Sequence, residues 1–129
     1  MTVRGLADTS VLIAREAGRR LEADRLPDEL AISVITLGEL RAGVLSARSS
    51  DARARRLDTL QRAMGLDVIP VDDAVASAWA ELRAKLRDGG RRMPVNDSWI
   101  AATALAHGLP VVTQDADYDG VPGLSVIQV

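Results

Sequence analysis

Short apolar runs alternate with helical segments along this chain, and this alternation constrains its fold more than any other feature. The apolar runs, which we interpret as strands, cover residues 3–7, 30–35, 67–71, 110–112 and 124–129. The helical segments cover residues 10–17, 37–46, 51–64, 74–88 and 98–107. A helix between two strands is typical of a βαβ crossover, whose strands are parallel. We therefore predict an α/β fold with a parallel sheet that is covered on both faces.

The segment 74–88 has the clearest helical pattern. Five of its residues recur at the spacing that places side chains on one face of a helix: Val75, Ala78, Trp79, Leu82 and Leu86. We expect this face to pack into the core, and Trp79 to be buried with it. Trp99, two residues after an acidic position, is also predicted to be packed rather than free to bind a ligand.

Composition limits the class of protein. The length of 129 residues fits one domain, which we expect to span residues 1–129. With 16 basic and 18 acidic residues, the net charge of −2 gives no overall attraction to nucleic acid or to a membrane surface. The chain has no cysteine, which excludes disulfides and thiolate metal sites. It shows neither a signal-peptide core nor a membrane-spanning apolar stretch, so we expect a cytoplasmic protein.

Four acidic residues lie where a predicted strand gives way to a loop or a helix: Asp8, Glu39, Asp97 and Asp115. In a parallel α/β sheet, these strand ends and helix starts gather at one edge. Carboxylates that meet there repel one another by about 4 kcal/mol per pair at about 4 Å, for an effective dielectric of about 20. A divalent cation relieves this repulsion. The pattern therefore predicts a Mg²⁺ or Mn²⁺ site that is built from oxygen ligands.

Three of these acids also have a structural interpretation as helix-capping residues. Glu39 follows Thr36 by three residues, which is the spacing of a capping box. Asp8 is suited to cap the first helix, and Asn96 to cap the next helix with Asp97 in its first turn. Taken one at a time, the acids leave the structural and the catalytic interpretations open.

Other acidic pairs show how easily such a pattern arises. Asp115 and Asp117 are of the residue type that favours turns. Asp72 and Asp73 follow the third predicted strand much as the four acids follow theirs, and we assign this pair to helix capping. Caps favour Ser, Thr, Asn or Asp without a preference for charge. The coincidence of four carboxylates at such positions therefore favours a shared site over separate caps.

Other hydrolytic chemistries lack the residues they need. The single histidine, His107, closes a helix just before Gly108, where it suits the helix C-terminus better than a catalytic role. The single lysine, Lys85, lies in the middle of a helix, and no Gly-rich phosphate-binding loop is present. A hydrolase built from these residues needs a metal-bound water as its nucleophile.

Four sequence blocks together resemble a PIN domain, and more narrowly the VapC-type toxins of bacterial toxin–antitoxin pairs. The blocks are Ala-Asp8-Thr9-Ser10, Ile-Thr36-Leu-Gly-Glu39, Asn96-Asp97-Ser-Trp and Val-Thr113-Gln-Asp115-Ala-Asp117-Tyr118. The resemblance covers nearly the whole chain. It implies a three-layer α/β/α sandwich with a five-stranded parallel sheet in the order 3-2-1-4-5. It also implies a Mg²⁺-dependent endoribonuclease that a cognate antitoxin holds inactive.

The resemblance assigns roles to individual residues. The implied catalytic residues are Asp8, Glu39, Asp97 and Asp115, and the implied metal ligands are Asp8, Asp97, Asp115 and Asp117. Thr9 and Thr113 would support the site, Mg²⁺ would be the cofactor with Mn²⁺ as a substitute, and one ion or two would bind. Gln114 and Tyr118 depart from the residues that are common in the family, and only the first departure puts a local hydrogen bond in question.

The sequence indicates the residues that bind substrate and partners less clearly than it indicates the acidic residues. The nearest candidates to bind RNA phosphates are Arg41, Arg91 and Arg92, although Arg41 has an equal interpretation as a solvated helix residue that pairs with a local acid. The resemblance also implies a homodimer, a higher toxin–antitoxin assembly, and no membrane partner. An antitoxin helix is expected on an apolar groove formed by Val11, Leu12, Leu37, Leu40, Val44 and Leu45, unless these residues simply pack on the sheet.

Two other classes of function stay open on the sequence alone. One is a catalytically inactive PIN-like module that binds RNA or protein. A cluster of anions argues against such a binder, because phosphates must approach it. The other is a Mg²⁺-binding phosphoacceptor regulatory domain, which usually needs a lysine at a later strand end, whereas Lys85 lies within a helix.

Overall fold

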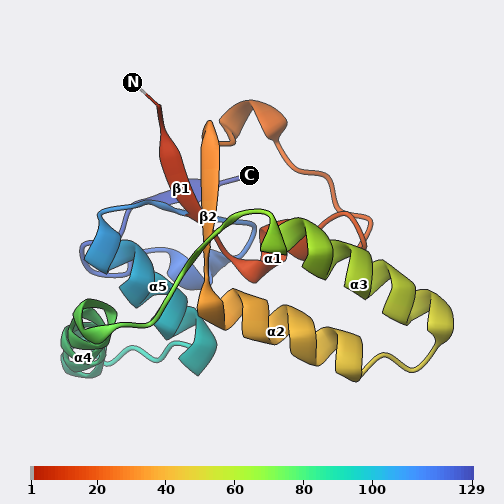
Figure 1. Cartoon of the computed structure of the whole chain (residues 1–129). Coiled ribbons are helices and arrows are strands. Elements are labelled where there is room, and N and C mark those ends of the chain that lie inside the picture. Colours follow the sequence, from red (N-terminus) through yellow and green to blue (C-terminus); the bar gives the residue numbers. More distant parts are fainter. Residues whose placement is uncertain (1) are drawn as a thin grey trace.

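The computed structural model describes residues 2–129 as a five-stranded sheet with helices packed on it (Figure 1). The strands are β1 (Arg4–Ala7), β2 (Glu29–Ser33), β3 (Asp67–Ile69), β4 (Val111–Thr113) and β5 (Val126–Gln128). The helices are α1 (Thr9–Ile13), α2 (Val34–Leu45), α3 (Ser50–Met64), α4 (Asp73–Asp88) and α5 (Val95–His107). Two single 3₁₀ turns, η1 (Ala23–Arg25) and η2 (Ala116–Tyr118), lie in the connections.

The strand order is β3-β2-β1-β4-β5, and every neighbouring pair is parallel. This confirms the predicted fold class and strand order. The first strand is central: Leu6 lies opposite Ala31 of β2 on one side and Val111 of β4 on the other. The residues that follow β1 therefore emerge at the middle of the sheet edge, with β2 and β4 beside them.

The two faces of the sheet carry separate hydrophobic clusters. Alternate residues of the central strands point to opposite faces: Leu6, Ala31 and Val111 to one, Ala7, Ile32 and Val112 to the other. The first cluster includes Leu82 and Leu86 of α4 and Ile100 of α5. The second includes Leu40 of α2 and Leu60 of α3. The helices thus cover both faces, as the predicted three-layer sandwich requires.

The second strand ends earlier than the sequence pattern predicted, and this changes the interpretation of Glu39. Ser33 is the N-cap of α2, since its side chain accepts a hydrogen bond from the backbone N–H of Ile35 (3.1 Å). The helix therefore starts at Val34, and Thr36 is buried within its first turn. The capping-box interpretation of Thr36 and Glu39 is wrong, because a serine three positions earlier already fills the cap.

The ends of other helices differ in smaller ways. The first helix stops at Ile13 instead of residue 17, although the N–H of Ala17 still donates to the Ile13 carbonyl (2.9 Å) in the turn that follows. Helix α5 starts at Val95 behind Pro94, so the prediction that Asn96 caps it is wrong. Asp97 lies in its first turn, as predicted.

Helix α4 begins at Asp73, one residue before the predicted start. The Asp72 side chain caps it by accepting a hydrogen bond from the backbone N–H of Val75 (3.0 Å). The assignment of Asp72 to capping is therefore confirmed, and Asp73 is exposed in the first turn. Among residues 2–129, no helix combines the length and the hydrophobicity that crossing a lipid bilayer requires.

Trp79 lies at the rim of the α4–α5 contact, so the prediction that it is a core residue is wrong. Its ring stacks on that of Trp99 with 4.3 Å between centroids and 2° between planes. Its indole N–H donates to the Ser98 hydroxyl (3.0 Å). A large ring with a polar N–H suits such a half-buried position, where the hydrogen bond is retained. The helical pattern indicated the correct face of α4 but not the depth of burial.

The central strand is crowded at Gly5, which gives a prediction about stability. A methyl group at Gly5 would lie 2.6 Å from the Val112 side chain and 2.9 Å from the Pro27 ring. We predict that Gly5→Ala destabilises the protein by about 1–3 kcal/mol, the usual cost of overpacking. Gly38→Ala adds the same methyl to α2 where no atom lies within 4 Å, and should stabilise by about 0.5–1 kcal/mol. Urea denaturation measures both, and equal stability of the two variants would contradict this packing.

Candidate acid site at the edge of the sheet

Five acidic side chains come from elements that end or begin at the carboxyl edge of the central strands. We call this group the acid site: Asp8, Glu39, Asp97, Asp115 and Asp117. Asp8 directly follows β1, and Asp115 follows β4, the neighbour of β1. Glu39 lies on α2, which follows β2, and Asp97 lies in the first turn of α5. The strand order therefore brings together residues that are up to about a hundred positions apart in sequence.

Asp8 is the most enclosed member, with 2% of its surface exposed. One carboxylate oxygen accepts hydrogen bonds from the backbone N–H (2.9 Å) and the hydroxyl of Ser10. The other accepts from the Thr113 hydroxyl (2.8 Å). Asp8 therefore caps α1 and also belongs to the acid site. A carboxylate offers about four lone pairs, so these bonds leave a lone pair for a further ligand.

Hydroxyl groups hold two of the acids in place. Thr113 fixes Asp8, and it also accepts a hydrogen bond from the backbone N–H of Asp115 (2.9 Å). The Thr9 hydroxyl donates to Glu39 (2.6 Å) and lies 3.3 Å from the Thr36 hydroxyl. Such bonds fix the direction of a carboxylate without neutralising its charge. The two predicted supporting threonines therefore contact acid-site carboxylates directly.

The pKa values of two acids report the proximity of the others. Burial raises the pKa of Asp8, and the charge of Asp115 raises it further, against the effect of the Ser10 and Thr113 hydrogen bonds. Burial, the interaction with Asp117 and the charge of Asp8 raise the pKa of Asp97 to about 7. Each of these carboxylates is therefore less stable in its charged form than it would be in water.

Tyr118 is a residue of the site whose role sequence reasoning missed. Its ring is fully buried, and its hydroxyl has no hydrogen-bond partner of normal geometry among residues 2–129. Burial raises its pKa, and the charges of Asp8, Asp97 and Glu39 add to this effect. The hydroxyl also partly offsets the raised pKa of Asp97. A polar group thus lies among three carboxylates, where the family resemblance alone suggested only a minor departure.

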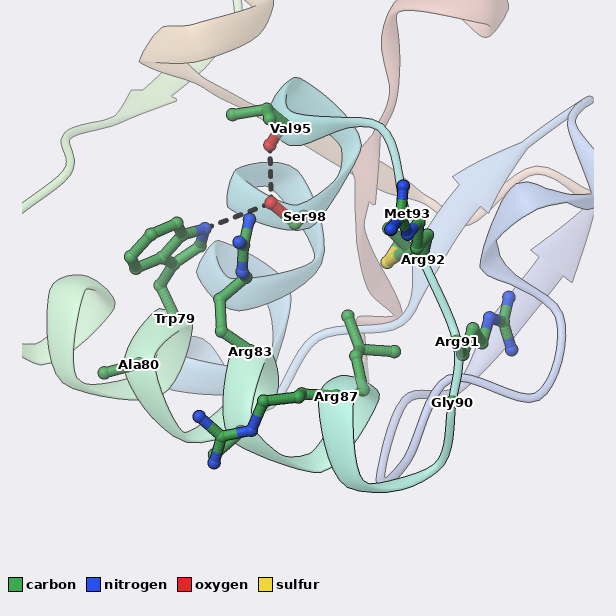
Figure 2. Close-up of a pocket in the computed structure, with 12 residues that line it drawn as sticks. Trp79, Ala80, Arg83, Arg87, Gly90, Arg91, Arg92, Met93, Val95 and Ser98 are labelled. Atoms are coloured by element: carbon green, nitrogen blue, oxygen red, sulfur yellow. Dashed lines mark hydrogen bonds between the residues drawn. The ribbon is translucent and has the colours of Figure 1, made fainter.

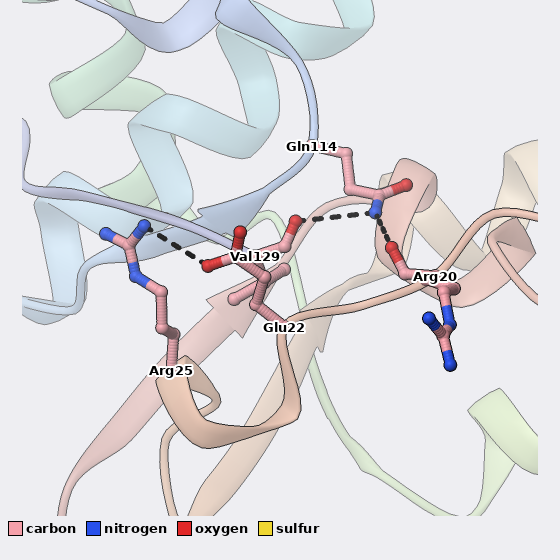
Figure 3. A network of polar contacts seen from close by, with 5 residues as sticks. All are labelled: Arg20, Glu22, Arg25, Gln114 and Val129. Carbon is pink, nitrogen blue, oxygen red and sulfur yellow. Dashed lines mark hydrogen bonds and ion pairs between the residues drawn. The ribbon is translucent and has the colours of Figure 1, made fainter.

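Gln114 ties the acid site to distant backbone segments (Figure 3). Its side-chain amide donates to the carbonyl oxygen of Arg20 (2.9 Å) and to that of Val129 (3.4 Å). Its carbonyl oxygen accepts from the Arg19 guanidinium (2.9 Å), and its backbone N–H donates to Ser10 (3.0 Å). These partners lie too far away in sequence for any local pattern to reveal them. Gln114 therefore makes several hydrogen bonds at the position where the sequence put a local hydrogen bond in question.

The acid site offers the kind of ligands that Mg²⁺ prefers. All its charged groups are carboxylates, and two of them have raised pKa values that a nearby cation would lower again. The described residues include no group of three or more His, Cys, Asp or Glu side chains arranged to hold an ion together. Mg²⁺ usually takes only one or two carboxylates directly and keeps several waters. The donor set fits such an ion better than a cage of four direct ligands.

The predicted RNA-binding arginines are not equivalent. Arg41 is exposed on α2, and Arg92 is exposed in the loop between α4 and α5. Arg91, in the same loop, donates hydrogen bonds to the carbonyl oxygens of Asp117 (2.8 Å) and Asp119. Arg91 therefore holds the turn that carries Asp117, while the other two predicted arginines extend into solvent.

The predicted antitoxin groove is not one surface. Val11 and Leu40 are buried in the second hydrophobic cluster, and three of the other residues pack against it: Leu12, Leu37 and Val44. Leu45 is 81% exposed and lies apart from them at the end of α2. The alternative, that these residues mainly pack on the sheet, therefore holds for five of the six. A separate hollow lies beside Glu39 and has a volume of about 440 Å³. Its lining includes Thr9, Ile13, Leu40 and Arg56.

Known proteins resemble this chain over nearly its whole length. The family model described as PIN domain matches residues 6–124. Ribonuclease VapC4 of Mycobacterium tuberculosis is 52% identical over 127 residues, 98% of this chain and 97% of that protein. Ribonuclease VapC5 of the same organism is 47% identical over 125 residues, 97% of this chain and 93% of that protein.

Solved structures agree with these relatives. A chain in the crystal structure of VapBC-5 from M. tuberculosis, a toxin–antitoxin system, superposes with a TM-score of 0.90 at 45% identity. The match covers 98% of this chain and 99% of that one. A chain of FitAcB from Neisseria gonorrhoeae gives a TM-score of 0.80 at 27% identity and 95% coverage of both. The chain belongs to the PIN-domain family and, within it, to the VapC ribonucleases.

Proposed function

We propose that this protein is a metal-dependent endoribonuclease, the toxin of a type II toxin–antitoxin pair. The single observation that carries the proposal is the acid site itself: carboxylates with raised pKa values gathered at the edge of a parallel sheet. The similarity of the chain to VapC ribonucleases supports RNA as the substrate. Cleavage of cellular RNA would place the protein in the cytoplasm.

The proposed roles follow from how each acid is held. Asp8 and Asp97 are the best candidates to bind Mg²⁺, directly or through water, with Asp115 and Asp117 close enough to add negative charge. Glu39, which accepts a hydrogen bond from Thr9, would accept a proton from an attacking water. Bound Mg²⁺ would lower the pKa of a water and offset the charge on the phosphate. With Glu39 as proton acceptor, hydrolysis that breaks the bond between phosphorus and the 3′ oxygen would leave a 5′-phosphate and a 3′-hydroxyl.

We propose a cognate antitoxin as the protein partner. The solved relatives include VapBC-5, a member of the VapBC family of toxin–antitoxin systems, and a toxin–antitoxin complex from Klebsiella pneumoniae. The hollow beside Glu39 is a suitable place for an inhibitory segment, because it joins apolar Ile13 and Leu40 to two acids, Glu16 and Glu39. A homodimer, within a larger toxin–antitoxin assembly, is also part of the proposal.

Loss of one acid-site carboxylate should abolish activity. We predict that Asp8→Asn lowers Mg²⁺-dependent cleavage of total cellular RNA by a factor on the order of 100 or more, because an amide does not supply the negative charge that binds the cation. The protein is purified free of antitoxin and assayed with Mg²⁺, with Mn²⁺ and with EDTA.

Asp72→Asn is the matched control for this prediction. It makes the same chemical change in an acid that caps α4, and asparagine caps a helix as well as aspartate does. Its activity should equal that of the wild type. Cleavage that persists in Asp8→Asn, or that ignores EDTA, would show that the acid site is not the catalytic centre and would favour a binding module.

The raised pKa of Asp97 predicts how stability depends on pH. The folded protein holds this proton up to a pKa of about 7, whereas the unfolded chain releases it near 3.8. Between these values the folded state binds more protons, so the stability of the metal-free protein should fall as the pH rises. Asp8 shifts in the same direction and adds to the slope.

Thermal unfolding across this pH range, in EDTA and in Mg²⁺, measures the effect. Asp97→Asn should flatten the decline in EDTA, because the titrating group is gone. Mg²⁺ should raise the melting temperature more at the upper end of the range, where the carboxylates are ionised. A metal-free protein that becomes more stable as the pH rises would rule out a raised pKa for these acids.

A further inference from the structure

A groove of about 870 Å³ runs along α4 and the loop that leads to α5 (Figure 2). Four arginines line it, Arg83 and Arg87 from α4 and Arg91 and Arg92 from the loop, together with Trp79 and Ser98. We call these six residues the basic groove. No acidic side chain is among the described residues that line it.

The positive charge of the basic groove is largely uncompensated. Neither Arg83 nor Arg92 makes an ion pair within the described part of the chain, and both are exposed. Arg87 lies 3.5 Å from the Asp88 carboxylate, but both side chains are more than two-thirds exposed, so this pair contributes little. A local basic surface on a chain of net charge −2 suits an anionic ligand.

One wall of the basic groove is a rigid, flat surface. Trp79 stacks on Trp99, and the Arg83 guanidinium lies 5.1 Å from the Trp79 ring centroid. The Trp79 N–H donates to Ser98, whose hydroxyl donates to the carbonyl oxygen of Val95 (Figure 2). Unpaired nucleobases stack on aromatic rings and on guanidinium planes. The wall therefore suits a base, while the other arginines suit phosphates.

The basic groove adjoins the acid site. Ser98 directly follows Asp97 in the first turns of α5. On the other side, Arg91 donates to the carbonyl oxygen of Asp117 (2.8 Å). The groove and the acid site therefore share the start of α5 and the turn at η2.

We propose that the basic groove is a subsite for single-stranded RNA that leads the substrate to the acid site. A base stacks on the outer face of the Arg83 guanidinium, whose inner face lies over the Trp79 ring, and phosphates accept hydrogen bonds from Arg87 and Arg92. A second copy of this chain fits less well, because a two-fold interface would set the same arginines against each other. The subsite deepens the proposed ribonuclease function and rests on it.

Equilibrium binding of RNA without cleavage tests the subsite. All proteins carry Asp8→Asn, metal is chelated, and a fluorescein-labelled single-stranded oligoribonucleotide reports binding by anisotropy. Arg83→Gln with Arg92→Gln should weaken binding roughly tenfold and lower the salt dependence of log K by about 0.7 for each phosphate that the variant no longer binds. RNA should also quench the tryptophan emission of the parent protein, because both tryptophans lie in the stack.

Arg53→Gln with Arg55→Gln is the matched control. It removes the same charge from exposed positions on α3, which lie outside the basic groove. This control should bind RNA as tightly as the parent. Equal loss of affinity in both double variants would overturn the subsite, since general attraction to a positive chain would then explain binding.

Cleavage by the same variants in the wild-type background separates this proposal from the proposed function. With Arg83→Gln and Arg92→Gln, KM should rise while kcat changes little, because the acid site is intact. If the wild type cleaves RNA and the variant has the same KM as the wild type, the subsite is refuted and the proposed function is not. Wild type that neither binds nor cleaves RNA would refute both. A change of oligomeric state in light scattering, with RNA affinity unchanged, would identify the groove as an interface between copies and overturn the subsite.

Discussion

The burial of neighbouring carboxylates at the end of the central strand is the constraint on which the rest of the structure depends. The order β3-β2-β1-β4-β5 brings Asp8 to the middle of the sheet edge, with the elements that carry the other acids around it. Burial and neighbouring charge then raise the pKa of Asp8 and Asp97. A fold that gathers such groups loses stability at neutral pH unless a cation binds them. This cost points to function, because helix caps alone do not require it.

Short polar side chains make this arrangement possible. Ser10 and Thr113 hold both oxygens of Asp8, and Thr9 holds Glu39, so each of these acids is oriented before any ligand arrives. A site whose groups are already oriented has less to reorganise during the reaction. The basic groove beside the acid site carries positive charge from four arginines, whereas the acid site carries negative charge. The arginines can therefore hold anionic RNA while its phosphate approaches the acid site, which would repel the phosphate if no cation were bound there.

The sequence predicted the parallel sheet and the positions of the acids, because both leave local patterns: apolar runs, helical spacing and charged residues at strand ends. The order of the strands came from the family resemblance, since periodicity does not say which strands are neighbours. Thr36 resembled a cap because Ser33, the actual cap, was assigned to a strand. Trp79 has the spacing of a core residue, but its depth depends on Trp99 of another helix. The hydrogen bonds of Gln114 span about a hundred positions and leave no local signal.

The most direct test of the central claim is a crystal structure of the toxin with Mn²⁺, read by anomalous scattering. If the acid site binds a cation, an anomalous peak should lie beside Asp8 and Asp97. Carboxylate oxygens that bind the ion directly should lie about 2.1 Å from it, and any others should contact it through a bridging water. Crystals that contain Mn²⁺ yet show no peak there, or show it only at surface carboxylates such as Asp72, would contradict the claim.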